Sequence, residues 1–220
     1  MRKLLLKLLL VLALFRLSIA FASSNIASEV LNYQKNCPEG DFKEISYVKE
    51  LLEYMYRFDQ DFRKLFIQNR DDQEIRSLLK IIDSFHILKM KQILNEHGWI
   101  TISRFGAEYD QKAWLLVQHA DDDSFFQAGV LFVLSCLVEK GETDKKNYAY
   151  LYDRVAAKFH QVGILQKYGT QVEIENSDIK LQPYEGSLDE VDKRRSEIGL
   201  EPLKDYLNNV KEIYKPSISY

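Results

Sequence analysis

The chain has 220 residues, with 30 basic and 33 acidic side chains. This length suits one domain with a hydrophobic core, because domains cluster at about 100 to 150 residues and split only at larger sizes. Proteins that bind nucleic acid carry clusters of Lys and Arg that neutralise phosphates and release counterions. The charge balance of this chain shows no such excess of basic residues, so we expect no nucleic-acid partner.

The first 22 residues have the order of a secretory signal. A basic start precedes the apolar run 8–15, and the small-residue pattern Ala20-Phe21-Ala22 follows. A membrane-spanning helix needs about 20 predominantly apolar residues, whereas Lys7 and Arg16 leave only a short run between them. We therefore expect residues 1–22 to be cleaved. The alternative is an amphipathic first helix that stays with the domain, which the late position of Arg16 favours.

Residues 23–220 are then expected to form an exported protein, periplasmic or secreted, without a stable membrane anchor. Cleavage removes Arg2, Lys3, Lys7 and Arg16 and no acid, which leaves 26 of the 30 basic side chains against 33 acidic ones. The mature protein is therefore acidic.

Two cysteines remain, Cys37 and Cys136. Export permits a disulfide between them, which in the chain-entropy model stabilises the fold by about 4 to 5 kcal/mol. Alternatively, Cys136 lies in the apolar run 129–138 and is a small buried hydrophobe. We favour this second interpretation, and we expect no metal site on the thiols, because neither has a ligand partner at zinc-finger spacing. His119 and Asp121 could bind a metal, but one histidine and one carboxylate make an incomplete set of ligands, so we expect no metal or other cofactor.

The first part of the mature chain predicts two amphipathic helices. Apolar residues recur at steps of three and four from Ile45 to Phe66, and again from Ile75 to Ile93. Acids at 71–74 suit the start of the second helix, and Gly98 suits its end.

A short loop, 99–106, leads to a third helix that ends near Ala120. Asp121 or Asp122 is expected to cap the fourth helix, which stops at Gly141 and carries the most apolar run of the mature chain. We expect this fourth helix to be the buried centre of the fold. A fifth helix is predicted from about Asp144 to His160.

The pattern then changes to alternation around a polar turn, with apolar-polar runs at 172–175 and 179–181. This predicts a small β-hairpin near residues 162–183. Two closing helices follow, at 187–199 and from Pro202 onward. The expected fold is mainly α: one compact helical domain, 23–220, of about six to seven helices with a small β-hairpin.

Polar residues gather at the end of the third helix and on the fifth. Trp114 and Gln118 are four residues apart and share one helix face, while His119 and Asp121 follow where the helix ends. On the fifth helix, the adjacent Asp153-Arg154 offers an acid and a guanidinium at one place.

The hairpin region adds Tyr168-Gly169-Thr170-Gln171, and Arg194 lies in the sixth helix. Glycine at 169 permits a backbone conformation or a close approach that a side chain would block.

These segments, in this order, resemble the successive motifs of a bacterial family of domains of unknown function. The resemblance covers roughly residues 98–206 and rests on the following segments: Gly98-Trp99, Trp114, Gln118-His119-Ala120-Asp121, Asp153-Arg154, Tyr168-Gly169-Thr170-Gln171, Val191-Asp192-Lys193-Arg194-Arg195 and Gly199-Leu200-Glu201-Pro202-Leu203. Two positions depart from the family pattern: Ile100 replaces a proline and Tyr152 replaces an acid. The resemblance implies no established activity.

The polar residues have three interpretations. In a binding or interaction domain they form a polar pocket around His119, Asp153, Arg154 and Tyr168 for a small ligand or a protein partner. The ligand-binding candidates are Trp114, Gln118, Tyr168, Thr170, Gln171 and Arg194.

In a hydrolase or transferase acting on a polar or anionic substrate, His119 is the general acid or base. Asp153 or Asp121 orients it, and Arg154 holds an anionic group together with Arg194. In the third interpretation the same residues form a structural network. We favour binding, and the test is whether the residues face an open concavity or bond to one another.

Overall fold

The computed structural model describes residues 26, 28–32, 34–35, 37–175 and 178–214. The predicted signal, 1–22, lies outside the described residues. Among those residues no helix has both the length and the apolar character needed to cross a membrane. The chain divides into two compact units between Ile93 and Leu94. The mainly α fold with a small hairpin is confirmed, whereas one domain from 23 to 220 stays a prediction.

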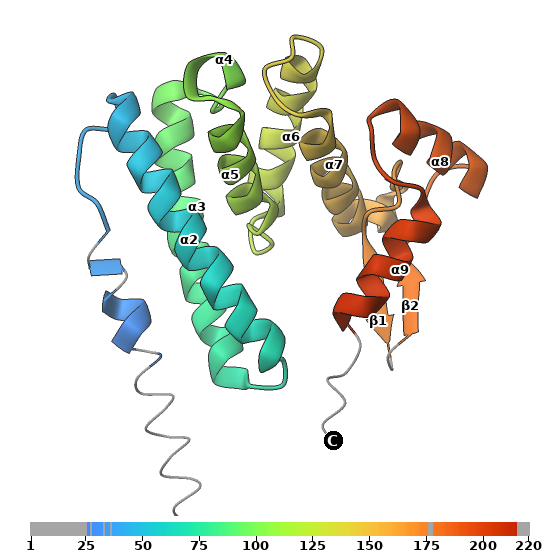
Figure 1. Ribbon diagram of the computed structural model, residues 1–220, viewed down its shortest axis with the longest axis horizontal. Helices are drawn as coiled ribbons and strands as arrows, with labels where there is room; N and C mark the ends of the chain where they lie inside the picture. Colours follow the sequence, from blue (N-terminus) through green and yellow to red (C-terminus); the bar gives the residue numbers. More distant parts are fainter. Residues whose placement is uncertain (1–25, 27, 33, 36, 176–177, 215–220) are drawn as a thin grey trace, which may run out of the picture. The chain divides into compact units, whose positions relative to one another are not determined.

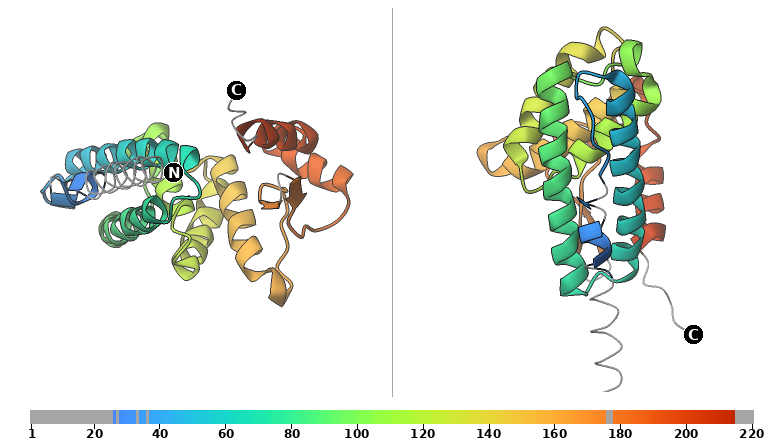
Figure 2. Two further views of the ribbon diagram at one scale, coloured as in Figure 1. Left: turned by 90° about the horizontal axis from the view of Figure 1, so that it is seen from below. Right: turned by 90° about the vertical axis from the view of Figure 1, so that its left-hand side faces the viewer.

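The first unit is built on two long helices that run side by side, α2 (Ile45–Gln68) and α3 (Gln73–His97) (Figures 1 and 2). Both match the predicted amphipathic helices. Asp72 accepts hydrogen bonds from the backbone N–H groups of Glu74 and Ile75 at 2.8 and 3.2 Å, which confirms that the acids here start the helix. One apolar cluster of this unit consists of Val30, Phe62, Ile75, Leu78, Leu79 and Ile82.

The second unit begins in the last turn of α3, where Gly98 has a positive φ of 69° and ends the helix as predicted. The segment 99–106 was expected to be a loop, but it contains a short helix, α4 (Ile102–Phe105), because Phe105 turns inward and is buried. Three helices then pack against one another: α5 (Ala107–Gln118), α6 (Ser124–Val138) and α7 (Lys145–Phe159) (Figure 1).

The expectation that the fourth predicted helix forms the buried centre is wrong. In α6, Phe125 and Phe132 are 80% and 71% exposed, and only Gln127, Val130 and Leu134 are buried. The cap was also assigned to the wrong residue. Asp123, not Asp121 or Asp122, accepts from the N–H of Phe126 at 2.9 Å.

A 3-10 turn, η1 (His160–Val162), leads to the hairpin of β1 (Val172–Glu175) and β2 (Asp178–Leu181). The strands are antiparallel, with Val172 opposite Leu181 and Glu173 opposite Lys180. The closing helices are α8 (Leu188–Glu197) and α9 (Leu203–Tyr214). Ser187 and Glu190 form a reciprocal capping box at the start of α8.

Both cysteines are free thiols. Cys37 is half-buried, and Cys136 is exposed on α6. The interpretation of Cys136 as a buried hydrophobe is therefore wrong, for the same reason as the centre of α6: the apolar run it belongs to is covered on one side only.

Candidate functional site

Asp153 of α7 is fully buried, and its carboxylate organises a loop. It accepts hydrogen bonds from the backbone N–H groups of Lys167, Tyr168 and Thr170 at 2.8 to 3.2 Å. Burial raises the pKa of the Asp153 carboxyl above its ordinary value, although these hydrogen bonds act in the opposite direction. The carboxylate therefore holds the segment 166–171, named here the 166–171 loop.

Gly169 allows this loop to turn. It has a positive φ of 65°, and a Cβ at this position would lie 3.1 Å from Cδ1 of Leu203. Both reasons given for a glycine here, the conformation and the close approach, are thus confirmed.

The carbonyl groups of the loop are bound from the closing helices. Arg194 donates to the carbonyl of Lys167 at 2.6 Å, and the fully buried Arg195 donates to that of Tyr168 at 2.7 Å. The hydroxyl of Tyr206 donates to the carbonyl of Thr170 at 2.6 Å. Arg194 also donates a hydrogen bond to the carbonyl of Glu185. Arg194 was expected to hold a ligand, but both of these hydrogen bonds go to the backbone.

Sequence reasoning missed Gln166, which is fully buried and links the loop to the hairpin. Its side-chain amide donates to the carbonyls of Gln171 and Gln182, both at 3.0 Å, and its oxygen accepts from the N–H of Gln171 at 2.7 Å. A single glutamine in an irregular segment carries no periodic signal, so its role depended on the tertiary structure.

A second missed residue, Asp110 of α5, is buried and fixes Trp99. Its carboxylate accepts from the indole N–H of Trp99 at 2.7 Å, from the side chain of Asn147 at 2.9 Å and from the N–H of Asp144 at 3.2 Å. Burial raises the pKa of Asp110, and these hydrogen bonds oppose the shift. Asp110 thus joins α5 to the start of α7, and Trp99 belongs to the core.

Arg154 gathers polar side chains from three segments. Its guanidinium grips the carboxylate of Asp121 with two hydrogen bonds, from Nε at 2.9 Å and from Nη2 at 2.5 Å. Nη1 donates to the side-chain oxygen of Gln171 at 3.1 Å. Arg154 is 24% exposed and Asp121 is 40% exposed, so this bidentate pair lies at the surface.

Further positive charge surrounds Asp121. Nζ of Lys158 lies 3.6 Å from the carboxylate. Burial raises the pKa of the Asp121 carboxyl, but the hydrogen bonds and charge of Arg154, with the charges of Lys158 and His119, outweigh burial and bring the pKa below its ordinary value. His119, the half-buried C-cap of α5, is therefore close to Asp121.

The facing sides of α5 and α7 continue from this point. The rings of Trp114 and Tyr150 are in T-shaped contact at 6.0 Å, and Tyr150 lies one turn before Arg154. Gln118 lies one turn after Trp114 and three residues before Asp121. Along α5 it therefore lies between the Trp114–Tyr150 contact and the Asp121–Arg154 pair. We name Trp114, Gln118, Asp121, Arg154 and Gln171 the α5–α7 site.

Two atoms of this site have unmet hydrogen-bonding capacity. Trp114 and Gln118 are only 8% and 6% exposed. Within the described part of the chain, neither the indole nitrogen of Trp114 nor the side-chain oxygen of Gln118 makes a hydrogen bond. A buried polar atom left unpaired costs about 1 to 3 kcal/mol, and such atoms are rare in folded proteins.

Tyr168 lies apart from Arg154. Its ring contacts that of Tyr152 at 6.4 Å in a T-shaped arrangement, and burial, with Tyr148 and Asp153 nearby, raises the pKa of Tyr168 to about 12. Residues two apart on an α-helix point about 200° apart around its axis, so Tyr152 and Arg154 leave α7 on opposite sides. The structure therefore brings Asp121, Arg154 and Gln171 together, and places Tyr168 across the helix.

The first unit contains a group that the sequence did not suggest. Asp59 on α2, with Asp83 and His86 on α3, offers three metal-binding atoms within 4.8 Å of one another. However, Arg63 bridges the two carboxylates, at 3.0 Å from Asp59 and 2.5 Å from Asp83. The guanidinium supplies the positive charge between them, and the group joins α2 to α3 as an ion-pair network.

These features define the second unit as a helical domain in which buried carboxylates fix a loop and two helices present a polar site. The chain belongs to DUF6624, a family of unknown function, whose model matches residues 47–218. The predicted membership of a family of unknown function is thus confirmed, and the match includes the whole α5–α7 site. No curated protein and no solved structure matches the chain.

Proposed function

We propose that this protein is an exported binding domain, and that its α5–α7 site captures a small polar ligand through a carboxylate or phosphate group. The observation that carries the proposal is the buried pair of unmet polar atoms, the donor of Trp114 and the acceptor of Gln118, on the helix that leads to Asp121, the partner of Arg154. A ligand with both an anionic group and a hydroxyl or amide would satisfy them together.

The charges around Arg154 support an anionic group. A planar guanidinium binds carboxylate and phosphate through two parallel hydrogen bonds, and Lys158 adds positive charge nearby, at 3.6 Å from Asp121. Asp121 holds the guanidinium in place with two hydrogen bonds, and both side chains are partly exposed, at 24% and 40%. A ligand anion can therefore reach the guanidinium from the solvent and share it with Asp121.

The same contacts favour binding over catalysis. A hydrolase or transferase with His119 as general acid or base needs a carboxylate to orient the imidazole. The carboxylate of Asp153 accepts three backbone N–H groups, and that of Asp121 is gripped by Arg154. Both candidate orienting groups already have structural partners.

Export is supported by the order of residues 1–22, a basic start, an apolar run and Ala20-Phe21-Ala22. Mass spectrometry of the protein from its native host should find Ser23 as the first residue. A mature protein that retains Met1 would contradict export through this signal.

Ligand binding is tested by calorimetric titration of the purified protein with inorganic phosphate and, separately, with malate, which distinguishes the two anion classes. Both probes carry an O–H group that can donate to the side-chain oxygen of Gln118. We expect one of them to bind. Arg154→Lys keeps the positive charge but removes the two parallel N–H donors of the guanidinium, so it should weaken binding about tenfold, equivalent to about 1.4 kcal/mol.

A second variant separates binding from folding. Gln118→Met removes a buried acceptor that has no partner among the described residues, so it should leave the melting temperature unchanged or raised while weakening anion binding. Gln111→Met, at an exposed position of the same helix, is the matched control and should change neither quantity. Failure of both anions to bind, or equal effects of the two glutamine variants, would refute the proposal.

A further inference from the structure

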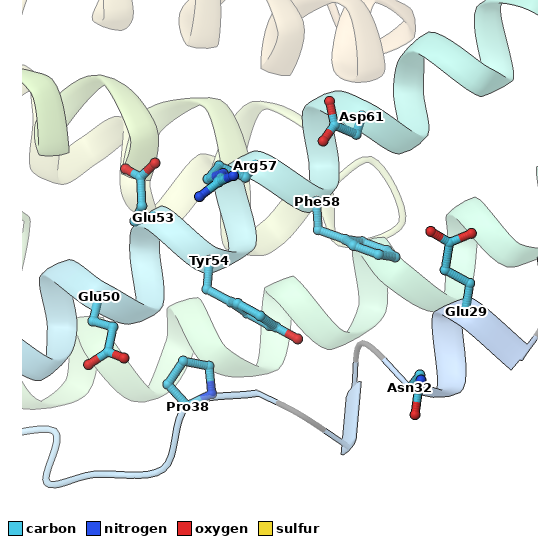
Figure 3. Close-up of a pocket in the computed structure, with 9 residues that line it drawn as sticks. All are labelled: Glu29, Asn32, Pro38, Glu50, Glu53, Tyr54, Arg57, Phe58 and Asp61. Atoms are coloured by element: carbon cyan, nitrogen blue, oxygen red, sulfur yellow. The ribbon is translucent and has the colours of Figure 1, made fainter.

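The first unit contains a cavity of about 540 Å³ that is lined by Glu29, Asn32 and Pro38 and by residues of α2 (Figure 3). This volume falls within the range of small-molecule sites, about 300 to 1,000 Å³. The cavity lies entirely within the first unit, and none of its lining residues belongs to the α5–α7 site.

Aromatic side chains form one wall. Tyr54 and Phe58 lie one turn apart on α2, and Figure 3 shows both rings pointing from the helix toward the segment that carries Pro38 and Asn32. The ring of Phe58 also stacks against that of Phe62, with ring centroids 6.1 Å apart. Tyr54 and Phe58 together line the cavity as an aromatic surface that suits an apolar group.

Acidic side chains surround this aromatic wall. The carboxylates that line the cavity are those of Glu29, Glu50, Glu53 and Asp61, and Arg57 is the basic residue among the lining positions. Asp61 also pairs with Lys64 at 3.0 Å, but both side chains are about three-quarters exposed, so this pair is weak. The lining therefore carries an excess of negative charge.

We propose that this cavity binds a small organic cation, with a primary ammonium or guanidinium group on a short apolar stem. A cation is attracted to the faces of Tyr54 and Phe58 and to the carboxylates of Glu50 and Glu53, while its stem replaces water against the rings and Pro38. The same charges disfavour anions. The site is thus independent of the anion-binding function proposed for the second unit.

The probe is 1,5-diaminopentane, titrated calorimetrically into the full-length protein, with 1,5-pentanediol as the uncharged probe of the same length. We expect the diamine to bind with one-to-one stoichiometry and the diol not to bind. Raising the ionic strength should weaken binding of the diamine, since salt screens interactions between partly exposed charges, with a screening length of about 10 Å at 0.1 M.

Variants locate the site. The double variant Glu50→Gln/Glu53→Gln should weaken diamine binding by about tenfold, because it removes two carboxylates and each partly exposed charge pair changes the affinity by up to about fivefold. Tyr54→Leu should also weaken it by removing a ring. Glu44→Gln removes an exposed carboxylate at the start of α2 that does not line the cavity, and should leave binding unchanged.

Thermal unfolding of each variant reports whether it is folded, and the double glutamine variant keeps the test valid if Tyr54→Leu unfolds. The proposal is overturned if the diamine does not bind, if the diol binds equally well, or if Glu44→Gln weakens binding as much as the double variant. Phosphate or malate binding to the α5–α7 site is measured in parallel, so failure of one site is distinguishable from failure of the other.

Discussion

A buried carboxylate is stable only when hydrogen bonds replace its hydration, and Asp153 achieves this with backbone N–H groups of the 166–171 loop. Asp153→Ala should leave the amides of Lys167, Tyr168 and Thr170 without their acceptor. Since each unpaired buried donor costs about 1 to 3 kcal/mol, we expect the free energy of unfolding to fall by about 3 kcal/mol or more.

Urea unfolding measures this loss. The control is Asp122→Ala, at an exposed position, which should change the free energy of unfolding by less than about 0.5 kcal/mol. Similar effects of the two substitutions would show that the loop does not depend on Asp153.

Asp121 should make stability depend on pH. Its pKa is lower in the folded protein than the ordinary value of 3.8, so its contribution is fully present above that value and is lost as the pH falls through the lowered folded pKa. Asp121→Asn removes this contribution, and the stability of the variant should decline less steeply below pH 3.8. Because Asp121 is 40% exposed, the difference should stay below about 1 kcal/mol.

Urea midpoints at pH 6 and pH 3, compared between wild type and Asp121→Asn, measure this difference in slope. Other carboxyls, such as Asp153 with its raised pKa, titrate alike in both proteins and cancel in the comparison. A variant that loses as much stability as the wild type between these values would show that the pair with Arg154 does not stabilise the fold.

At the scale of elements, α6 shows why an apolar run is not by itself a buried one. Its sequence is apolar on all sides, so no stripe marks the covered face. Contacts with α5 and α7 bury Val130 and Leu134 and leave Phe125 and Phe132 exposed.

Substitutions on the two faces of α6 should therefore differ. Leu134→Ala should lower the free energy of unfolding by about 2 to 5 kcal/mol through the cavity that it creates. Phe132→Ala, at a side chain that is 71% exposed, should change it by less than about 0.5 kcal/mol. Thermal or urea unfolding compares them, and an equal loss in both variants would mean that Phe132 is covered in solution.

The hairpin and the helix ends were predictable because their signals are local. The alternation of apolar and polar residues at 172–175 and 179–181 predicted the two strands, and Gly98 predicted the end of α3. The cap of α6 was misplaced because three consecutive aspartates, 121–123, are equivalent as caps in sequence. Tertiary contacts separated them: Arg154 binds Asp121, while Asp123 caps the helix.

At the scale of the whole molecule, the fold should be independent of thiol oxidation. Both Cys37 and Cys136 are free, and apolar clusters such as that around Phe62 and Ile82 supply the hydrophobic stabilisation. We expect Cys37→Ser, and addition of a thiol reductant to the wild type, to leave the melting temperature unchanged. A large decrease in either measurement would reveal a bridge between the two thiols.

The sequence by itself determined the longer helices, the hairpin and the family, because amphipathic periodicity and glycine stops act over a few residues, whereas it missed the short helix α4. It also identified Arg154, Asp121 and Gln171 as unusual. Their pairing was decided only by the tertiary structure, since the contacts of Arg154 span 33 and 17 residues. The same holds for the link from Asp110 to Trp99 and Asn147.

Tertiary structure also decided which side of an element faces its neighbours. Tyr168 contacts one side of α7 through Tyr152, whereas Arg154 leaves the helix on the other side, and α6 exposes Phe125 and Phe132. Composition could not give these outcomes, because a helix that is apolar or polar on all sides can pack in several orientations of similar local energy. The neighbouring helices and the 166–171 loop select one of them through long-range contacts that no local pattern encodes.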